Sequence, residues 1–514
     1  MLAAASDRTV GWEIVVIGGG ATGLGIAVDA AARGYRTLLL EKGDFANATS
    51  SRSTKLIHGG VRYLQQGNIK LVREALRERG LLMKNAAHLV HPLQFVIPSA
   101  TRWEGLFYAT GLKIYDAMSG RYGIGHTKRL SRQKTEELLP TVRKELFVGG
   151  TAYADGQFDD ARLAIALART AVDLGATVLN YSTVTSLQKE GGRICGVITR
   201  DVESGEEMEI QAKVVINATG VFSDEVRRLD DPSSATSLSP SQGAHVILPK
   251  SFFPGDSALM IPKTDDGRVL FAIPWHDRVL VGTTDTAVEK IEPAPRPLPS
   301  EVEFLLTHAG RYLSKAPQPS DVLCMFAGLR PLAAAPTSRQ SALIPRDHHL
   351  SISESGLITI TGGKWTTYRR MARDTVDRAR AVGNLSGRLC RTEDLRLHGC
   401  PEAADSASNR SVYGSDAAGL TELAGKQPEG DAPLHARLPC SAAEIIWAVR
   451  FEMARTLEDV LARRTRALFL DVRASLEIAP RVAALMAREL RRDSGWQKEQ
   501  ARQFEALARA YLPS

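Results

Sequence analysis

One segment near the start of the chain, IVVIGGGATGLGIAVDAAARGYRTLLLE at residues 14–41, constrains the fold more than any other feature. An apolar run predicts a buried strand, which turns through Gly18, Gly20 and Gly23 into a helix of small residues. A second apolar run follows and ends on Glu41. Glycines in this G-x-G-x-x-G spacing, between a strand and a helix, are typical of a parallel α/β unit that binds a dinucleotide.

Each residue of this pattern has a physical role in such a unit. Gly18 permits the tight turn, Gly20 lets a pyrophosphate approach the backbone, and Gly23 lets the helix pack closely on the strand. The helix N-terminus then faces the phosphates. An acidic side chain about 20 residues further on can accept hydrogen bonds from ribose hydroxyls, and Glu41 has that position. The alternative is a glycine-rich turn in some other α/β protein.

Composition excludes several classes of protein. A chain of 514 residues is too long for one compact core, so we expect two or three domains. The net charge of +7 suits an anionic substrate or an anionic membrane surface as well as nucleic acid. Because no basic run carries interleaved aromatic residues, we expect no nucleic-acid partner.

The cysteine pattern favours a reducing cytosol, because the five cysteines are scattered and none forms a C-x-x-C pair. No cluster of His, Cys, Asp or Glu has metal-ligand spacing, so we expect no metal.

The chain shows no signal for secretion or for membrane insertion. Its first residues, MLAAASDRTVGWE, have neither a basic segment nor a long apolar one, so we expect no secretory signal. No run of about 18 uninterrupted apolar residues is present, so membrane contact should be peripheral. Residues 102–125, RWEGLFYATGLKIYDAMSGRYGIG, mix aromatic and basic side chains and allow two interpretations. They form either a core helix with one solvated face or an interfacial helix among lipid headgroups.

The order of the patterns predicts a domain organisation. The strand-like run KVVINATG at 213–220 and the strand, Gly-Gly turn and helix at 355–379 indicate two returns of the chain to the first domain. Short β-like runs between residues 242 and 330 predict an antiparallel sheet on the substrate side. Residues 400–437 lack strong periodicity, and from residue 441 onward the pattern is helical.

Several motifs together give the chain a specific resemblance. They are IGGGATGLG at 17–25, ATSSRSTKLIHGGVRYL at 48–64, FDDARL at 158–163, NATG at 217–220, IPWHDRVLVGTTDT at 273–286, GLRPL at 328–332, TGGKWTTYRRMA at 361–372 and FEMARTLEDVLARRTRALFLD at 451–471. With these motifs the chain resembles the FAD-dependent, quinone-reducing sn-glycerol-3-phosphate dehydrogenases over nearly its whole length. The glycine pattern alone would indicate only a large flavoprotein superfamily.

The resemblance implies an α/β, Rossmann-like FAD-binding domain with an antiparallel β-rich substrate cap, followed by an all-α C-terminal domain. We expect an oxidoreductase region at 12–395, with FAD-binding segments at about 12–100, 150–225 and 355–390 and a substrate cap at about 226–354, then a linker at 396–437 and a helical domain at 438–514.

The implied reaction is the oxidation of sn-glycerol 3-phosphate to dihydroxyacetone phosphate by hydride transfer to FAD, with electrons passed on to a membrane quinone. The resemblance also implies a cytoplasmic protein that contacts the inner face of the cell membrane peripherally, and it leaves a homodimer open. Two alternatives remain: a glycerol-3-phosphate oxidase that uses oxygen, and a flavin-binding paralogue without catalytic activity.

Glycines, hydroxyl side chains and one lysine are the residues that the resemblance assigns to FAD. They are Gly18, Gly20, Gly23, Glu41, Thr49, Ser50, Ser51, His58, Ala218, Thr219, Gly220, Gly362, Gly363 and Lys364. Hydroxyls and backbone amides can cradle phosphate or ring edges, and a lysine or amide near the isoalloxazine can balance negative charge on the reduced ring.

The substrate residues implied by the resemblance are mainly cations, because a phosphate dianion suits a planar guanidinium. They are Arg62, Tyr63, His245, Arg330, Arg346 and Lys364. We expect Arg330 to be the first phosphate contact, with Arg346 next. His245 is preferred over His58 as the acceptor of the hydroxyl proton, since an imidazole titrates near neutrality. His245, Arg330 and Lys364 form the predicted catalytic set.

Two carboxylates in FDDARL, Asp159 and Asp160, could form a catalytic pair. We expect them instead to cap the helix that follows, because Asp near a helix start satisfies free N–H groups and the dipole. The same interpretation applies to Asp224, just after NATG.

Overall fold

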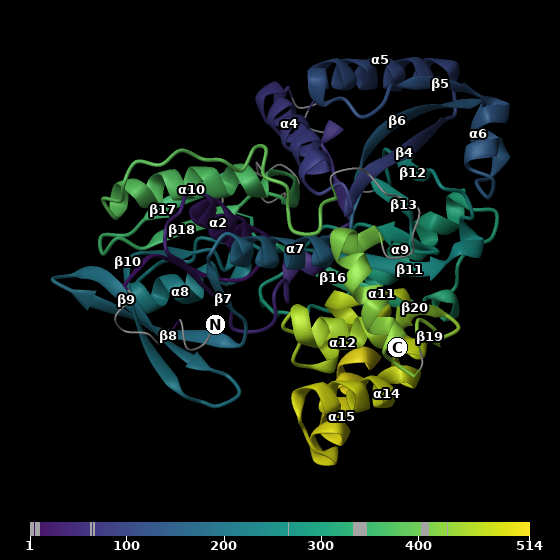
Figure 1. The fold of residues 1–514 in the computed structure, drawn as a ribbon. Coiled ribbons are helices and arrows are strands. Elements are labelled where there is room, and N and C mark those ends of the chain that lie inside the picture. Colours follow the sequence, from purple (N-terminus) through teal and green to yellow (C-terminus); the bar gives the residue numbers. More distant parts are fainter. Residues whose placement is uncertain are drawn as a thin grey trace.

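The computed structural model describes residues 5, 11–61, 64, 67–265, 267–332, 347–401, 411–428 and 430–513. Two large β-sheets lie side by side, and a group of C-terminal helices packs below the second one (Figure 1). The first sheet is built around parallel strands, as its apolar sequence pattern predicts.

The first sheet gathers strands from three distant parts of the chain. β1 and β2 come from the glycine-rich segment, and β10 and β18 pair next to them in parallel, so the two predicted returns of the chain are present. β17 pairs antiparallel with β18, and the β8–β9 hairpin extends from β10. The bounds are β1 Trp12–Ile17, β2 Thr37–Leu40, β7 Thr177–Leu179, β8 Ser182–Glu190, β9 Arg193–Asp201, β10 Glu207–Asn217, β17 His348–Ile352 and β18 Ile358–Gly362.

Helices cover this sheet because their apolar stripes need a partner surface. α2 packs between α7 and α10, and the three helices share one core with β1, β2 and β10. Figure 1 shows α2 and α10 stacked over the same region. The helix bounds are α2 Ala21–Ala32, α7 Asp160–Asp173, α8 Ser223–Asp230 and α10 Tyr368–Val382.

The second sheet is mostly antiparallel, as predicted for the substrate side. Its order is β15-β11-β14-β13-β12-β4-β6-β3, with β16 on β11 and β5 on β6. The bounds are β3 Leu56–Ile57, β4 Val90–Ser99, β5 Lys128–Ser131, β6 Gly149–Phe158, β11 Ser241–Pro249, β12 Ala258–Ile261, β13 Leu270–Trp275, β14 Arg278–Gly282, β15 Thr286–Ala287 and β16 Cys324–Arg330. β3, β4 and β6 lie in segments expected for FAD binding, yet they pair here.

That difference has a simple cause. An apolar strand carries no local signal for which sheet it joins, and the long pairing of β4 with β6 fixes both in the second sheet. The exact domain boundaries stay a prediction. The remaining helices of this half are α4 Ile69–Asn85, α5 Arg102–Ser119, α6 Arg132–Leu138 and α9 Pro299–Tyr312.

The C-terminal part is helical and shares its core with the second sheet. Phe95, Ile273 and Phe326 of the sheet lie in the same buried cluster as Leu461 and Phe469. The elements are α11 Ala417–Gly425, β19 Pro433–His435, β20 Leu438–Ser441, α12 Ala442–Phe451, a π-helical turn η10 Asp459–Arg464, α13 Ala467–Leu470, α14 Val472–Leu490 and α15 Ser494–Arg509. In the part of the chain that the structure describes, no helix combines the length and apolarity needed to cross a bilayer.

Gly23→Ala should destabilise the fold. A Cβ at Gly23 would lie 1.8 Å from the carbonyl oxygen of Gly18, so α2 would have to move off β1. We expect the free energy of unfolding to fall by about 1–3 kcal/mol, measured by chemical denaturation. Gly111→Ala in α5 is the control, since nothing lies within 4 Å of its added Cβ. Equal stability of the two variants would contradict the role given to this helix–strand contact.

Candidate active site

Two cavities meet between the sheets. The first, of about 420 Å³, is lined by the start of α2 and by residues that follow β2, β10 and β18. The second, of about 330 Å³, is lined by the second sheet and by the segment after Thr49. Both cavities are lined by Thr49, Pro331, Gly362, Gly363, Lys364 and Trp365. A flat ring seated at this shared rim would face both spaces.

The glycine turn forms one wall of the first cavity. Gly18 has a φ of +109°, and a Cβ there would lie 2.8 Å from the carbonyl oxygen of Ala218. The amide of Ala21, at the first turn of α2, donates to Ser50 Oγ at 2.9 Å. The helix start and a hydroxyl loop therefore meet where the sequence predicts the pyrophosphate.

Glu41 lies in the same wall and holds the turn itself. Its carboxylate accepts hydrogen bonds from the amides of Gly19 at 2.6 Å and Gly43 at 2.8 Å. Burial raises the pKa of Glu41 above its ordinary value, although the two amides oppose the shift. The sequence indicated a ribose contact, and these backbone bonds are an additional role that the spacing did not reveal.

The predicted cofactor and substrate residues divide between the two cavities. The first is lined by Gly18, Gly20, Glu41, Thr49, Ser50, Ala218, Thr219, Gly220, Gly362, Gly363 and Lys364. The second is lined by Thr49, His58, His245, Arg330, Gly362, Gly363 and Lys364. Gly23 and Ser51 line neither: Gly23 packs α2 on the strand, and the carbonyl of Ser51 accepts from Lys55 and Arg466 behind the loop. Arg62, Tyr63 and Arg346 lie outside the described residues.

Arg330, at the end of β16, presents an oriented guanidinium to the second cavity. Its Nη1 lies 3.1 Å from Asp285 Oδ1, and its Nη2 donates to the carbonyl of Thr284 at 2.9 Å. Asp285 was not predicted, although it lies in the motif IPWHDRVLVGTTDT. Because its carboxylate fixes the guanidinium, Arg330 can meet an anion with little loss of side-chain entropy.

His245 faces the same cavity from β11. Its Nε2 lies 2.9 Å from the hydroxyl of Thr54, and its ring stacks on Phe326 at a centroid distance of 4.8 Å. Burial holds the pKa of His245 well below its ordinary value, and the nearby charges of Lys55 and Arg330 add to the shift. The imidazole is therefore neutral at physiological pH, which is the form that can accept a proton.

The two carboxylates of FDDARL, Asp159 and Asp160, have different partners. Asp159 caps α7 by accepting from the amide of Arg162 at 3.0 Å, as predicted. Asp160 also lies in the first turn, but its Oδ2 lies 2.7 Å from Lys55 Nζ. Asp224 lies in the first turn of α8 but caps none of its amides, contrary to the prediction, because its carboxylate accepts from the amide of Ser237 and from Arg227 Nη1. Among the described residues, no group of three His, Cys, Asp or Glu side chains could hold a metal ion.

Comparison with known proteins identifies the family. Residues 13–369 match the FAD-dependent oxidoreductases, and residues 358–501 match the C-terminal domain of alpha-glycerophosphate oxidase. The chain is 41% identical to the mitochondrial glycerol-3-phosphate dehydrogenase of Macaca fascicularis, over 96% of this chain and 72% of that protein. The chain belongs to the FAD-dependent glycerol-3-phosphate dehydrogenase family. The human mitochondrial enzyme is 40% identical over 97% of this chain and 73% of its own length.

One solved structure supports this family, and a more distant one shows the same fold. The glycerol-3-phosphate dehydrogenase of Bacillus halodurans, complexed with FAD, has a TM-score of 0.81 and 30% identity, and covers 99% of this chain and 97% of its own. The L-alpha-glycerophosphate oxidase of Mycoplasma pneumoniae, with FAD bound, has a TM-score of 0.58 at 16% identity over 74% of this chain and 97% of its own, and shows the shared fold. The cofactor of this protein is therefore FAD.

The residues of the first cavity fit that cofactor. Gly18 and Gly20 leave the start of α2 open to a phosphate, and a Cβ at Gly20 would lie 3.0 Å from Ser50 Oγ. Glu41 and residues 218–220 line the cavity beside this turn, and Lys364 lies at the rim shared with the second cavity. The chain thus supplies the amides of a helix start, an acidic acceptor and a cation to the lining of one cavity.

Glu41→Ala should weaken FAD binding. Loss of the carboxylate leaves the amides of Gly19 and Gly43 unbonded and loosens the turn that borders the cavity. We expect the FAD dissociation constant to rise about tenfold or more, measured by flavin fluorescence on the apoprotein. Glu13→Ala is the matched control, because Glu13 also accepts a backbone amide, that of Arg36, but at an exposed site. An unchanged dissociation constant in Glu41→Ala would contradict the assignment.

Proposed function

We propose that this protein oxidises sn-glycerol 3-phosphate to dihydroxyacetone phosphate and passes the electrons to a membrane quinone. The relatives with which the chain shares about two fifths of its residues are named glycerol-3-phosphate dehydrogenases. The observation that carries the proposal is the second cavity, which places the anchored guanidinium of Arg330 and the neutral ring of His245 beside the rim lined by Lys364.

The residues divide the chemistry among them. FAD, when bound, accepts the hydride that leaves C2 of the substrate. Arg330 binds the phosphate, because its guanidinium is already oriented by Asp285. His245 takes the proton of the C2 hydroxyl as the carbonyl forms, and Thr54 holds the ring through Nε2. Lys364, at the shared rim, balances negative charge that develops there. Substrate contacts by Arg62, Tyr63 and Arg346 stay predictions, since these residues lie outside the described part of the chain.

Arg330→Ala should separate substrate binding from cofactor binding. Under anaerobic conditions, sn-glycerol 3-phosphate should bleach the visible flavin absorption of the parent, and plain glycerol should not. In the variant we expect half-maximal bleaching to require about 30-fold more substrate, because a buried charged contact of about 2 kcal/mol or more is lost. FAD content should stay unchanged.

Arg311→Ala is the control for that experiment, since its ion pair with Asp265 is exposed on α9. No bleaching of a protein that holds FAD would refute the substrate assignment. Equal bleaching in Arg330→Ala and the parent would refute only the role of Arg330 and would leave the substrate assignment intact.

The electron acceptor separates two candidates. The C-terminal match to a domain of alpha-glycerophosphate oxidase supports oxygen as the second one. Adding a soluble quinone or oxygen to the bleached enzyme distinguishes them: the proposed dehydrogenase regains its colour with quinone much faster than with oxygen. Faster recovery with oxygen, accompanied by hydrogen peroxide, would establish the oxidase.

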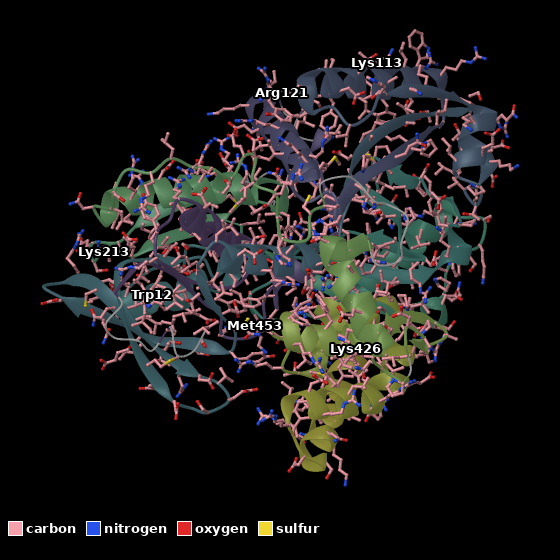
Figure 2. All side chains as sticks on the ribbon, viewed as in Figure 1. Trp12, Lys113, Arg121, Lys213, Lys426 and Met453 are labelled. Atoms are coloured by element: carbon pink, nitrogen blue, oxygen red, sulfur yellow. The ribbon has the colours of Figure 1, made fainter. Side chains whose placement is uncertain are left out.

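A surface for the membrane is part of the proposal. On α5 the side chains of Trp103, Phe107 and Ile114 are 80%, 64% and 51% exposed, while Leu112 and Tyr115 face the core. Figure 2 shows Lys113 and Arg121 on the same outer edge of the molecule. Exposed aromatic residues with basic neighbours suit the headgroup region of an anionic bilayer. Both interpretations of residues 102–125 thus find support on opposite faces of one helix. A homodimer stays a prediction.

Replacing Trp103 and Phe107 together by Ser should weaken membrane binding. The change removes apolar area that would enter the interface, and we expect vesicle binding to fall about tenfold or more. Co-sedimentation with vesicles containing phosphatidylglycerol measures it. Leu389→Ser is the control, because Leu389 is 81% exposed but lies far from α5 in sequence, after α10. Undiminished binding of the double variant would contradict α5 as the contact surface.

A further inference from the structure

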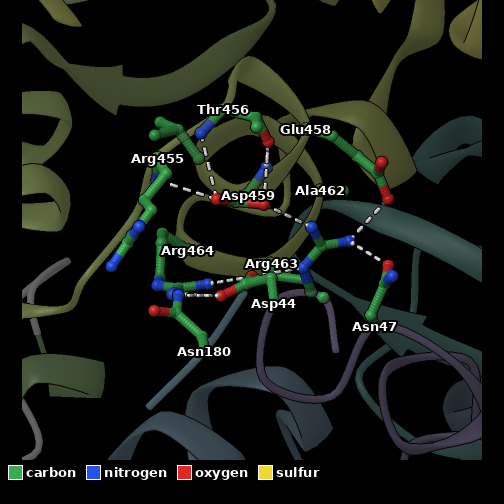
Figure 3. Close-up of polar contacts among 12 residues, drawn as sticks. Asp44, Asn47, Asn180, Arg455, Thr456, Glu458, Asp459, Ala462, Arg463 and Arg464 are labelled. Atoms are coloured by element: carbon green, nitrogen blue, oxygen red, sulfur yellow. Dashed lines mark hydrogen bonds and ion pairs between the residues drawn. The ribbon is translucent and has the colours of Figure 1, made fainter. Parts of the chain in front are cut away.

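The C-terminal helical part reaches the cofactor region through buried arginines. Residues 44–54, here called the cofactor loop, connect the FAD-binding sheet to the second sheet, and Asn47, Thr49 and Ser50 of this loop line the first cavity. At the start of this loop, the carboxylate of Asp44 accepts hydrogen bonds from Arg463 Nε at 2.5 Å and from the two terminal nitrogens of Arg464 at 2.6 and 2.8 Å (Figure 3). The partners are separated by 419 and 420 residues in the sequence.

Further contacts follow along the loop. Arg463 Nη1 donates to the side-chain oxygen of Asn47 at 3.1 Å, and Arg466 Nη2 donates to the carbonyl of Ser51 at 3.1 Å. Arg52 Nη2 donates to the hydroxyl of Tyr511 at 2.9 Å, close to the end of the chain. The C-terminal part therefore holds the cofactor loop at four positions within nine residues of sequence.

A π-helical turn, Asp459–Arg464, makes the first of these contacts possible. Neighbouring residues of a regular helix point in different directions, yet Arg463 and Arg464 reach one carboxylate here. Asp459 fixes the turn from inside, because it accepts from Arg463 Nη2 at 2.7 Å and from the amide of Thr456 at 3.0 Å (Figure 3). π-Turns of this kind occur frequently at functional sites.

The cluster of Asp44, Arg463 and Arg464 is buried, and its charges are paired with one another. Asp44, Arg463 and Arg464 are at most 2% exposed. Burial alone would raise the pKa of Asp44, but the guanidinium groups of Arg464 and Arg463 lower it to about 2. Buried ion pairs add little net stability compared with apolar packing, and removing one partner leaves an uncompensated charge. We therefore infer that this cluster serves to fix one arrangement of the chain rather than to add stability.

None of these C-terminal arginines lines either cavity, so any effect on the cofactor is indirect, and their hydrogen bonds to Asp44, Asn47 and Ser51 give it a route through the loop. We propose that Arg463, Arg464 and Arg466 are positioning residues that hold the cofactor loop in the shape FAD requires. FAD affinity and docking of the C-terminal helices are then linked equilibria, and each strengthens the other by the same factor. The inference goes beyond the proposed reaction and rests on FAD binding alone, so it stands or falls independently of the substrate.

A double-mutant cycle tests the link directly. Full-length apoprotein is prepared as the parent, Arg464→Met, Asp44→Asn and the double variant, and each is titrated with FAD while flavin fluorescence is followed. Each single change should raise the dissociation constant about tenfold or more, and the double change should raise it by less than the product of the two. Single variants that fold and bind FAD with the parent's dissociation constant would overturn the proposal.

Tyr511→Phe keeps the test decisive where Arg464→Met fails to fold. It removes one hydroxyl from Arg52 and leaves the ring packed near Phe469. The dissociation constant for FAD should rise about threefold, with the denaturation midpoint of the apoprotein close to the parent's. Arg450→Gln is the control, since its ion pair with Glu489 lies on the C-terminal surface and touches no loop residue. Unchanged FAD affinity in Tyr511→Phe would overturn the proposed link between FAD binding and docking of the C-terminal helices.

The reciprocal effect needs no substitution. Hydrogen exchange of the full chain is compared with and without FAD, in the absence of substrate. FAD should slow exchange of amides in η10 and α13 about as much as in the cofactor loop, while α6, which contacts neither cavity, should not change. Protection confined to the cofactor loop would overturn the linkage.

Discussion

The buried carboxylate of Asp44 is the interaction on which the arrangement of the site depends. It stands where the chain leaves the glycine-bearing sheet, and Arg463 and Arg464 neutralise it from the far end of the sequence. A charge at this depth is tolerated only with such partners, so the loop that follows has few alternative paths. That loop borders both cavities through Thr49. One electrostatic requirement thereby joins the FAD-binding sheet, the second sheet and the C-terminal helices.

The two cavities differ in the charged and titratable groups that line them. The first cavity is lined by the start of α2, whose amides suit phosphates, and by Lys364 on the rim shared with the second cavity. The second holds Arg330, already oriented by Asp285, beside a histidine whose pKa is held low by burial and neighbouring cations. A cation for the anion and a neutral base for the proton can thus work side by side, because a guanidinium stays protonated in proteins while burial lowers the pKa of His245.

Local sequence patterns predicted those parts of the fold that depend on local physics. The strand, glycine turn and helix at residues 14–41 follow from periodicity and steric requirements, and the capping role of Asp159 follows from its position. The partners of Asp160 and Asp44 could not be predicted, since contacts across 105 and 420 residues leave no periodic signal. The placement of β4 and β6 in the second sheet was not predicted, because an apolar strand carries no local signal for which sheet it joins. The resemblance supplied the site residues, and it directed attention to Ser51, whose side chain lines neither cavity.

The most direct test of the account is a crystal structure of the holoenzyme with glycerol 2-phosphate, a phosphate ester that lacks an oxidisable C2 hydroxyl. The account predicts the pyrophosphate of FAD at the start of α2, the flavin ring at the rim lined by Gly362, Gly363 and Lys364, and the phosphate of the ester against Arg330. An ester phosphate bound away from Arg330, or a flavin ring outside the shared rim, would contradict it.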